Sequence, residues 1–315
     1  MIEKLDNLEG RSKRQMRTTL KSFCIRILIL LLFSCKESSS VGLPNLENKK
    51  GLLNRNLLYQ NQIREYILYI PQSYSEDTPL PVMLNFHGFG GTAKRHLRSA
   101  DMRELSESKG FILIYPQGTL LGNYAHWNPS LIGEGNKSST DDLGFIDKLL
   151  TTLPEEINID SSRIYACGYS NGGFFSYGLA CNLYSQIAAI GSVAGTMMSD
   201  TYENCQATMP KPMINIHGVN DPIVPYEGAP GLVPINDVLN FWSELNFAEN
   251  VEINFFEGVE NYVYKDSIET PFVSHYKILN GTHTWDYNSL LSNNINTNEL
   301  IWEFVSKFDI NGFIE

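Results

Sequence analysis

Three segments of this 315-residue chain carry side chains that could together perform nucleophilic catalysis. Ser170 lies in Gly168-Tyr-Ser-Asn-Gly172, which fits the pattern G-x-S-x-G, and it follows a short apolar run at 163–167. A helical pattern begins at Phe174. Strand, sharp turn and helix around this pentapeptide predict a nucleophile elbow, in which glycines let a strained serine project from the turn. The alternative is a glycine-rich turn with an incidental serine.

A serine hydroxyl needs a base within hydrogen-bonding reach and an acid that orients the base. Two later loops provide both residue types, each next to an apolar strand pattern. Asp221 follows the strand pattern at 212–217, and His283 follows the one at 272–279. Because catalytic groups gather at the carboxyl ends of parallel strands, we expect Ser170, Asp221 and His283 to meet at one edge of the sheet.

Other histidines and acids fit these two roles less well. His217 ends a strand pattern and is a candidate support for the acid loop, whereas His275 lies inside a strand, where a structural role fits better. His96 and His126 have no strand-end context. Asp237 lies at a helix start, where capping explains an acid.

A glycine-rich segment, His87-Gly-Phe-Gly-Gly91, follows a third apolar strand pattern at 81–86. Acyl transfer places negative charge on the carbonyl oxygen, and one pre-positioned backbone donor typically stabilises it by roughly 3 kcal/mol. The expected donors are the N–H groups of Phe89 and Asn171. The alternative is an ordinary turn after a strand.

Three aromatic side chains are candidates for contact with a substrate. They belong to His87, Trp127 and Trp285. Trp285 lies two residues after the expected base, so it is expected to form a wall of the cleft, with packing in the core as the alternative.

Short apolar runs alternate with helical patterns along the body of the chain. Strands are expected at 63–70, 81–86, 111–115, 163–167, 187–194, 212–217, 251–256 and 272–279, and helices at 97–109, from 141, from 174, at 235–247 and at 298–308. Asp141 and Asp142 are expected to cap a helix. The alternation predicts an α/β fold with a mostly parallel sheet, helices on both faces and no large lid. Residues 257–270 fit no element.

Composition narrows the classes of partner. The chain is 43% hydrophobic and has a net charge of −11, and since residues 1–34 carry +4, the remainder carries −15. An acidic body argues against nucleic acid or an anionic membrane surface as a partner. The five cysteines show no spacing typical of a zinc site, and no metal is expected.

The N-terminal segment has the composition of an export signal. Basic residues at 11–26 precede an apolar run at 27–33, which is too short to span a bilayer. Leu32-Phe-Ser-Cys35 resembles a bacterial lipobox, so Cys35 is expected to be lipidated and to become the mature N-terminus. An ordinary cleaved signal is the alternative, and Met16 is an alternative start.

These features divide the chain into three parts and place the mature protein outside the cytoplasm. The parts are a signal peptide at 1–34, a polar tether at 35–56 and a catalytic domain at 57–315. The expected location is the cell envelope, at the outer membrane or in the periplasm, with secretion as the alternative.

Five motifs together resemble the polyhydroxybutyrate depolymerase / feruloyl esterase family of α/β-hydrolases. They are Gly168–Gly173, His87–Gly91, Asp141–Phe145, His217–Tyr226 and Gly281–Trp285. The resemblance covers about residues 60–290. It implies an α/β-hydrolase fold without a cofactor, with Ser170 as nucleophile, Asp221 as acid and His283 as base. It also implies a disulfide between Cys181 and Cys205, for which two unpaired thiols are the alternative.

The resemblance further implies a serine esterase that acts through an acyl-enzyme on small-molecule or oligosaccharide esters. Feruloyl or acetyl esters of plant polysaccharides are the expected substrates. Three alternatives stay open: a polyhydroxyalkanoate depolymerase, a serine peptidase of the same fold, and a catalytically inactive binding lipoprotein.

Overall fold

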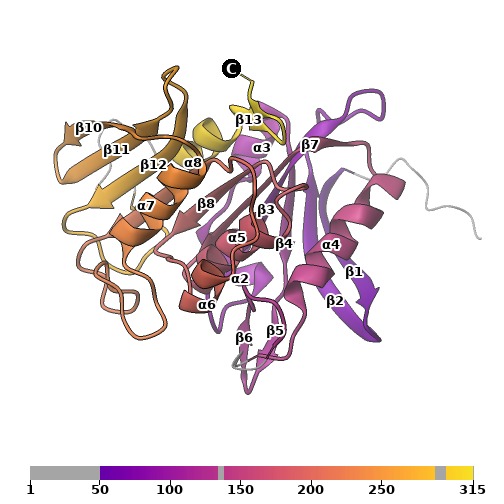
Figure 1. The fold of residues 1–315 in the computed structure, drawn as a ribbon. Helices are drawn as coiled ribbons and strands as arrows, with labels where there is room; N and C mark the ends of the chain where they lie inside the picture. Colours follow the sequence, from indigo (N-terminus) through magenta and orange to yellow (C-terminus); the bar gives the residue numbers. More distant parts are fainter. Residues whose placement is uncertain (1–49, 134–137, 288–295, 315) are drawn as a thin grey trace, which may run out of the picture. The chain divides into compact units, whose positions relative to one another are not determined.

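A ten-stranded sheet forms the centre of the computed structural model, which describes residues 50–133, 138–287 and 296–314 (Figure 1). From one edge to the other, the strands are β1 (Gly51–Tyr59), β2 (Gln62–Ile70), β4 (Ile112–Pro116), β3 (Leu80–Phe86), β7 (Ile159–Tyr169), β8 (Ala189–Val193), β9 (Met213–Gly218), β12 (Pro271–Ile278), β11 (Val259–Lys265) and β10 (Asn250–Phe256). The six strands from β4 to β12 run parallel, and the two strands at each edge are antiparallel to their neighbours. The predicted mostly parallel sheet is confirmed.

Helices cover both faces of this sheet. One face packs against α4 (Asp142–Thr152), α5 (Asn171–Asn182) and α7 (Ile235–Leu245), and the other against α2 (Ala93–Ser99), α3 (Arg103–Lys109) and α8 (Thr297–Val305) (Figure 1). Each face therefore has its own apolar core. The parallel strands are buried between the two cores, which explains their continuous apolar runs.

Several shorter elements complete the unit. They are the hairpin β5 (Thr119–Leu121) and β6 (Tyr124–His126), the 3-10 turn η2 (Leu153–Glu155), helix α6 (Ser199–Glu203), and the hairpin β13 (Phe308–Asp309) and β14 (Gly312–Phe313). Within the described ranges, no helix is both long and apolar enough to cross a membrane.

The first strand corrects the expected boundary between tether and domain. β1 begins at Gly51, whereas the tether was expected to run to residue 56. Alternate side chains of β1 turn inward, and Leu53, Leu57 and Tyr59 pack on the core. Such period-two burial gives no continuous apolar run, so the strand resembles a polar segment in the sequence. Residues 1–49, including Cys35, lie outside the described residues.

The expected single helix over 97–109 is two helices. Between them Tyr115 holds the chain in a turn, because its hydroxyl donates to the carbonyl of Ala100 at 2.7 Å and accepts from the N–H of Met102 at 3.2 Å. Both Ala100 and Met102 are buried. A straight helix would not allow both contacts.

Residues 257–270, which fitted no predicted element, contain strand β11. It lies between β10 and β12 and pairs antiparallel with both. Gly258 has a φ of 75° in the turn that joins β10 to β11, a conformation that glycine adopts without strain. The segment therefore completes a three-stranded meander at the edge of the sheet.

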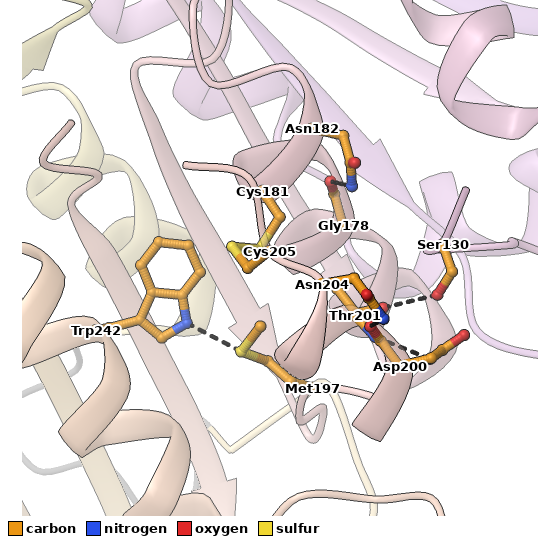
Figure 2. Close-up of a disulfide and its surroundings, with 10 residues drawn as sticks. All are labelled: Ser130, Gly178, Cys181, Asn182, Met197, Asp200, Thr201, Asn204, Cys205 and Trp242. Carbon is orange, nitrogen blue, oxygen red and sulfur yellow. Dashed lines mark hydrogen bonds between the residues drawn. A yellow bond between two sulfur atoms is a disulfide. The ribbon is translucent and has the colours of Figure 1, made fainter. Parts of the chain in front are cut away.

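The expected disulfide between Cys181 and Cys205 is present (Figure 2). It joins the last turn of α5 to the segment after α6, and the N–H of Gln206 donates to the carbonyl of Cys181 at 3.2 Å. A second contact to α6 joins the hydroxyls of Thr201 and Ser130, which are 2.9 Å apart (Figure 2). The bridge therefore secures α6 against the helix that begins at the predicted nucleophile.

Candidate active site

Ser170 forms the turn between β7 and α5. Its φ of 54° and ψ of −118° are strained for a residue with a side chain, as expected for a nucleophile elbow. The turn is tight because its glycines allow close backbone contact. A Cβ on Gly172 would lie 2.2 Å from the carbonyl oxygen of Phe86, and one on Gly168 would lie 2.3 Å from the backbone of Gly172. No larger residue fits these two positions without movement of the main chain.

The structure brings the three predicted triad residues into one chain of hydrogen bonds. His283 Nε2 lies 3.0 Å from Ser170 Oγ, and His283 Nδ1 lies 2.7 Å from Asp221 Oδ2. A carboxylate only accepts, so Nδ1 carries the proton and Nε2 is left to accept from the Ser170 hydroxyl. This tautomer is the one that a general base requires.

Asp221 is held in place by its own loop. Its Oδ1 accepts from the N–H groups of Ile223 at 2.8 Å and Val224 at 2.9 Å. Burial raises the pKa of Asp221, but hydrogen bonds from His283 and these amides outweigh burial and hold the pKa below its usual value. The carboxylate therefore stays ionised near neutral pH.

His217 supports the acid loop, as its place at the end of a strand suggested. Its Nε2 donates to the carbonyl of Val224 at 2.8 Å and lies 3.6 Å from Asp221 Oδ2. Burial lowers the pKa of His217, so the ring is neutral near pH 7. It ties together the two ends of the segment that carries the acid.

The loop that carries the base His283 is held by hydrogen bonds on two sides, one of them from the residue next to the nucleophile. The hydroxyl of Tyr169 donates to the carbonyl of His283 at 3.0 Å, and the two rings lie 5.0 Å apart. On the other side, the hydroxyl of Tyr287 donates to the carbonyl of Thr282 at 2.6 Å. The sequence analysis missed both tyrosines, because neither contact follows from spacing along the chain.

The glycine-rich loop after β3 lies against the nucleophile. A Cβ on Gly88 would be 3.4 Å from the Cβ of Ser170. The loop is closed by a hydrogen bond of 2.9 Å from the N–H of Gly91 to the carbonyl of Gly88, while the N–H of Gly90 donates to Ala125 at 2.7 Å. Among the described residues, no carbonyl accepts from the N–H of Phe89. That amide is therefore available to a substrate oxygen.

The side chain of Asn171 is hydrogen-bonded to the backbone of Trp127 and so holds the start of α5 in place. Its Oδ1 accepts from the N–H of Trp127 at 2.7 Å, and its Nδ2 donates to the carbonyl of Trp127 at 2.9 Å. This two-way contact fixes the first residue of α5 against the segment after β6. It holds in place the amide that was predicted to be the second oxyanion donor.

The prediction that His87 contacts substrate is wrong, because its ring is buried behind the loop. Its Nε2 accepts from the N–H of Gly118 at 3.0 Å, so Nδ1 carries the proton and donates to the carbonyl of Gly88 at 2.8 Å. Burial lowers the pKa of His87 to about 4. The His87 ring is therefore neutral near pH 7 and supports the glycine-rich loop by hydrogen bonds.

Neither predicted tryptophan forms a wall of the cleft. Trp127 is buried and stacks on Phe175 with ring centroids 5.0 Å apart, on the face of the sheet that α4, α5 and α7 cover. Trp285 is buried on the opposite face, where its Nε1 donates to Asn298 at 3.0 Å and its ring meets the edge of His96. The packing alternative for Trp285 is therefore correct, and both rings serve the core.

The remaining histidines outside the triad have structural partners. His96 Nε2 lies 2.7 Å from Asn85 Oδ1, and burial lowers the pKa of His96 to about 3. His275 Nε2 lies 2.9 Å from the hydroxyl of Tyr226. His126 Nε2 lies 2.7 Å from Ser138 Oγ. These positions agree with the sequence-based choice of His283 as the base.

The two adjacent acids at the start of α4 have different roles. Asp141 is the N-cap, as predicted, and accepts from the N–H of Gly144 at 2.9 Å. Asp142 is fully buried and pairs with Arg64 of β2 at 2.6 Å, and it also accepts from the N–H of Asn128 at 2.8 Å. Capping alone was expected for Asp142, so the ion pair is a correction.

Solved structures share this arrangement of sheet and helices. An acetyl xylan esterase from Aspergillus awamori has a TM-score of 0.55 at 17% identity, over 74% of this chain and 94% of the other. A thermostable esterase has a TM-score of 0.57 at 16% identity, over 82% of this chain and 63% of the other. The chain has the α/β-hydrolase fold.

Curated relatives of this chain are esterases by name. A bifunctional acetylxylan esterase/xylanase of Neocallimastix patriciarum is 24% identical over 79% of this chain and 34% of its own length. A probable feruloyl esterase C of Aspergillus niger is 29% identical over 55% of this chain and 60% of its own length. The chain thus spans between a third and three fifths of these relatives. No family model matches the sequence.

Proposed function

We propose that this protein is a serine carboxylic-ester hydrolase that works through an acyl-enzyme. The observation that carries the proposal is the hydrogen-bond chain from Ser170 Oγ through His283 to Asp221, with contacts of 3.0 and 2.7 Å. Nucleophile, base and orienting acid are within the reach that such a mechanism needs. The names of the similar esterases point the same way.

The proposed reaction has two similar halves. His283 Nε2 takes the hydroxyl proton as Ser170 Oγ attacks the ester carbonyl carbon. The N–H groups of Phe89 and Asn171 donate to the resulting oxyanion, and Asp221 stabilises the imidazolium. His283 then protonates the leaving alkoxide, so the alcohol departs and the acyl group stays on Ser170. Water attacks this ester with His283 again as base, and the free acid leaves.

The proposed substrates are feruloyl or acetyl esters of plant polysaccharides, taken as small or oligosaccharide esters. The support is the naming of the relatives as acetylxylan and feruloyl esterases. A polyhydroxyalkanoate depolymerase is the second candidate, on the resemblance of the motifs around Ser170 and His87. A serine peptidase of this fold and an inactive binding lipoprotein complete the alternatives.

We also propose that the catalytic domain is exported and held at the cell envelope by a lipid on Cys35. The disulfide between Cys181 and Cys205 supports export, since such bonds persist in oxidising compartments. The basic and apolar segments before Cys35 have the order of an export signal. Labelling of the full chain with a radioactive fatty acid tests the anchor. Label that survives Cys35→Ala would contradict it.

A fluorophosphonate probe tests the proposed nucleophile. We expect stoichiometric labelling at Ser170, found by peptide mass mapping, and none in the Ser170→Ala protein. A protein that stays unlabelled, while circular dichroism shows it folded, would identify an inactive binding protein. Labelling at another serine would remove Ser170 from its role.

A substrate panel then separates the esterase candidates. Methyl ferulate, acetylated xylo-oligosaccharide, a short hydroxybutyrate oligomer and a peptide p-nitroanilide are compared by kcat/KM with the same enzyme preparation. We expect the highest kcat/KM values for methyl ferulate and the acetylated xylo-oligosaccharide. Dominant turnover of the hydroxybutyrate oligomer would favour the depolymerase, and turnover of the anilide alone would favour the peptidase.

A further inference from the structure

Two exposed aromatic rings lie beside the glycine-rich loop. Phe89 and Tyr124 have ring centroids 5.4 Å apart and planes tilted by 31°. Both remain largely in solvent, with 55% of Phe89 and 58% of Tyr124 exposed. Exposed apolar side chains that gather in one place mark binding surfaces more often than isolated ones do. The reaction proposed above assigns no role to either ring.

The β5–β6 hairpin carries Tyr124 to this position. Its two-residue turn needs a positive φ at the first central residue, and Gly122 supplies 63°. Leu121 and Tyr124 face each other across the hairpin as a pair. We call Phe89, Leu121 and Tyr124 the aromatic platform. Leu121 is also exposed and extends the apolar surface next to Tyr124.

The aromatic platform is tied to the loop that was predicted to hold the oxyanion. The N–H of Gly90 donates to the carbonyl of Ala125 at 2.7 Å, directly after Tyr124. At the base of the hairpin, the N–H of Gly118 donates to His87 Nε2 at 3.0 Å. The hairpin and the loop are therefore held together at both ends. The platform has a fixed place relative to the amide of Phe89.

The order of the strands decides which part of an ester meets the platform. The loop of Phe89 follows β3 and the hairpin follows β4, whereas Asp221 follows β9 and His283 follows β12. Ser170 follows β7, which lies between these two groups of strands. His283 must reach the leaving oxygen to protonate it. The alcohol therefore leaves on the side of the base, and the side of the platform is open to the acyl group.

The composition of the platform favours an apolar planar ring over a sugar. Residues 88–92 and 119–126 contain no Asp, Glu, Lys or Arg. Sugar sites need polar groups that pair with hydroxyls, whereas an aryl ring gains from aromatic and aliphatic neighbours. Tyr124 adds one hydroxyl at the edge of the ring surface.

We propose that the aromatic platform binds the aryl ring of an aromatic acyl group, such as a hydroxycinnamoyl group, and so selects feruloyl over acetyl esters. The proposal rests on the proposed esterase function and deepens it. The surface would hold the ring while the ester carbonyl lies between Ser170 and the amide of Phe89. Specificity for the acyl group would then come from a hairpin that contributes no triad residue.

The kinetic test keeps the leaving group constant and changes only the acyl group. For Tyr124→Ala we expect the ratio of kcat/KM for p-nitrophenyl ferulate to that for p-nitrophenyl acetate to fall about fivefold, the usual scale for loss of one aromatic stacking partner. Tyr124→Phe keeps the ring and should retain most of the ratio. An unchanged ratio in Tyr124→Ala would overturn the proposal.

A second arm keeps the acyl group constant and changes the alcohol. It compares acetylated xylo-oligosaccharide with p-nitrophenyl acetate. If Tyr124→Ala lowers kcat/KM for the oligosaccharide selectively and leaves the ferulate ratio intact, the platform binds sugar and our assignment is wrong. Phe255→Ala is the matched control, because Phe255 is 73% exposed on β10 at the far edge of the sheet. It should change neither ratio.

A binding measurement separates failure of this proposal from failure of the proposed function. Methyl ferulate is titrated into Ser170→Ala protein, with and without Tyr124→Ala, and followed by NMR. We expect the second substitution to weaken binding about fivefold. Equal affinities would overturn the platform even in an active esterase. If Tyr124→Ala weakens binding but the protein with Ser170 intact hydrolyses no ester, the platform is upheld and the esterase function is refuted.

Discussion

At the scale of single residues, Ser170 combines strain with function. Its φ of 54° lies where glycine is favoured, yet the position carries a side chain. Backbone strain of this kind costs on the order of 1–3 kcal/mol and is kept only where the surroundings enforce it. Here the backbone at Gly168 and Gly172 packs so closely that neither position has room for a side chain.

Relief of this strain gives a first prediction. Ser170→Gly should unfold with a free energy about 1 kcal/mol higher than Ser170→Ala, because glycine adopts the observed φ freely while alanine keeps the Cβ. Both variants lack the nucleophile and should be inactive. Urea unfolding at pH 7 measures the difference. An alanine variant as stable as the glycine variant would mean that the turn is not strained.

A second prediction concerns the orienting acid. Asp221→Asn should lower kcat by about 10⁴-fold, because an amide can donate to His283 Nδ1 and favour the wrong imidazole tautomer. The hydrogen bonds that Oδ1 accepts from Ile223 and Val224 can persist, so stability should change little. Steady-state kinetics with p-nitrophenyl acetate and a thermal melt test both parts. A loss below tenfold would show that His283 is oriented by other groups.

At the scale of elements, site residues could be predicted from the sequence wherever a local motif follows the end of a strand. The nucleophile elbow could be predicted from Gly168–Gly172 and the apolar run before it alone. Asp221 and His283 could be chosen because each lies next to a recognisable strand, and parallel strand ends share one edge of the sheet. The structure brings these three side chains together.

Elements and contacts that depend on tertiary packing could not be predicted. β1 has alternating burial, which in the sequence resembles a polar tether. Trp127 and Trp285 lie close to the motifs along the chain, yet each turns into a core on a different face of the sheet. Arg64 and Asp142 are 78 residues apart, and nothing local in either segment indicates the pair.

The pair of Arg64 and Asp142 gives a prediction at this scale. It joins β2 to the start of α4, and both side chains are buried. Arg64→Leu should reduce the free energy of unfolding by roughly 3–5 kcal/mol, because it leaves an uncompensated buried carboxylate. Adding Asp142→Asn should recover part of that loss, since the buried charge is then gone. Guanidinium unfolding of both variants tests this, and equal stabilities would contradict it.

At the scale of the whole molecule, buried histidines couple stability to pH. Burial lowers the pKa of His87 to about 4, of His96 to about 3 and of His275 to about 3. These rings are neutral in the folded protein, whereas in the unfolded chain they take up protons below pH 6.5. The unfolded state therefore binds more protons between about pH 6.5 and 4, and stability falls as pH falls through that range.

We expect the free energy of unfolding to drop between pH 7 and pH 5, by roughly 1 kcal/mol per histidine for each pH unit below 6.5. Urea titrations at pH 7, 6 and 5 measure the slope. His96→Gln should make it shallower by the contribution of one histidine. A stability that does not change across this range would show that these rings titrate normally in the folded state.

The disulfide is a second determinant of stability for the molecule as a whole. It closes a loop between residues 24 apart, and its loss should reduce the free energy of unfolding by about 3 kcal/mol. Thermal melts of Cys181→Ala/Cys205→Ala and of the native protein compare the two states. The melt of the double variant should not respond to a reductant. Cys167 is buried and unpaired, so the control Cys167→Ala keeps the bridge, and its melt should shift with a reductant as that of the native protein does. A double variant as stable as the native protein would contradict this expectation.

The contact from Tyr169 to the carbonyl of His283 has a further consequence for how such a site can change. The residue directly before the nucleophile is hydrogen-bonded to the loop that carries the base. The distance between nucleophile and base is therefore set by two adjacent residues at the end of one strand. Surrounding loops are thereby free to lengthen, shrink or be exchanged without resetting the catalytic spacing. Changes in these loops can therefore alter substrate specificity while the geometry of the catalytic triad stays the same.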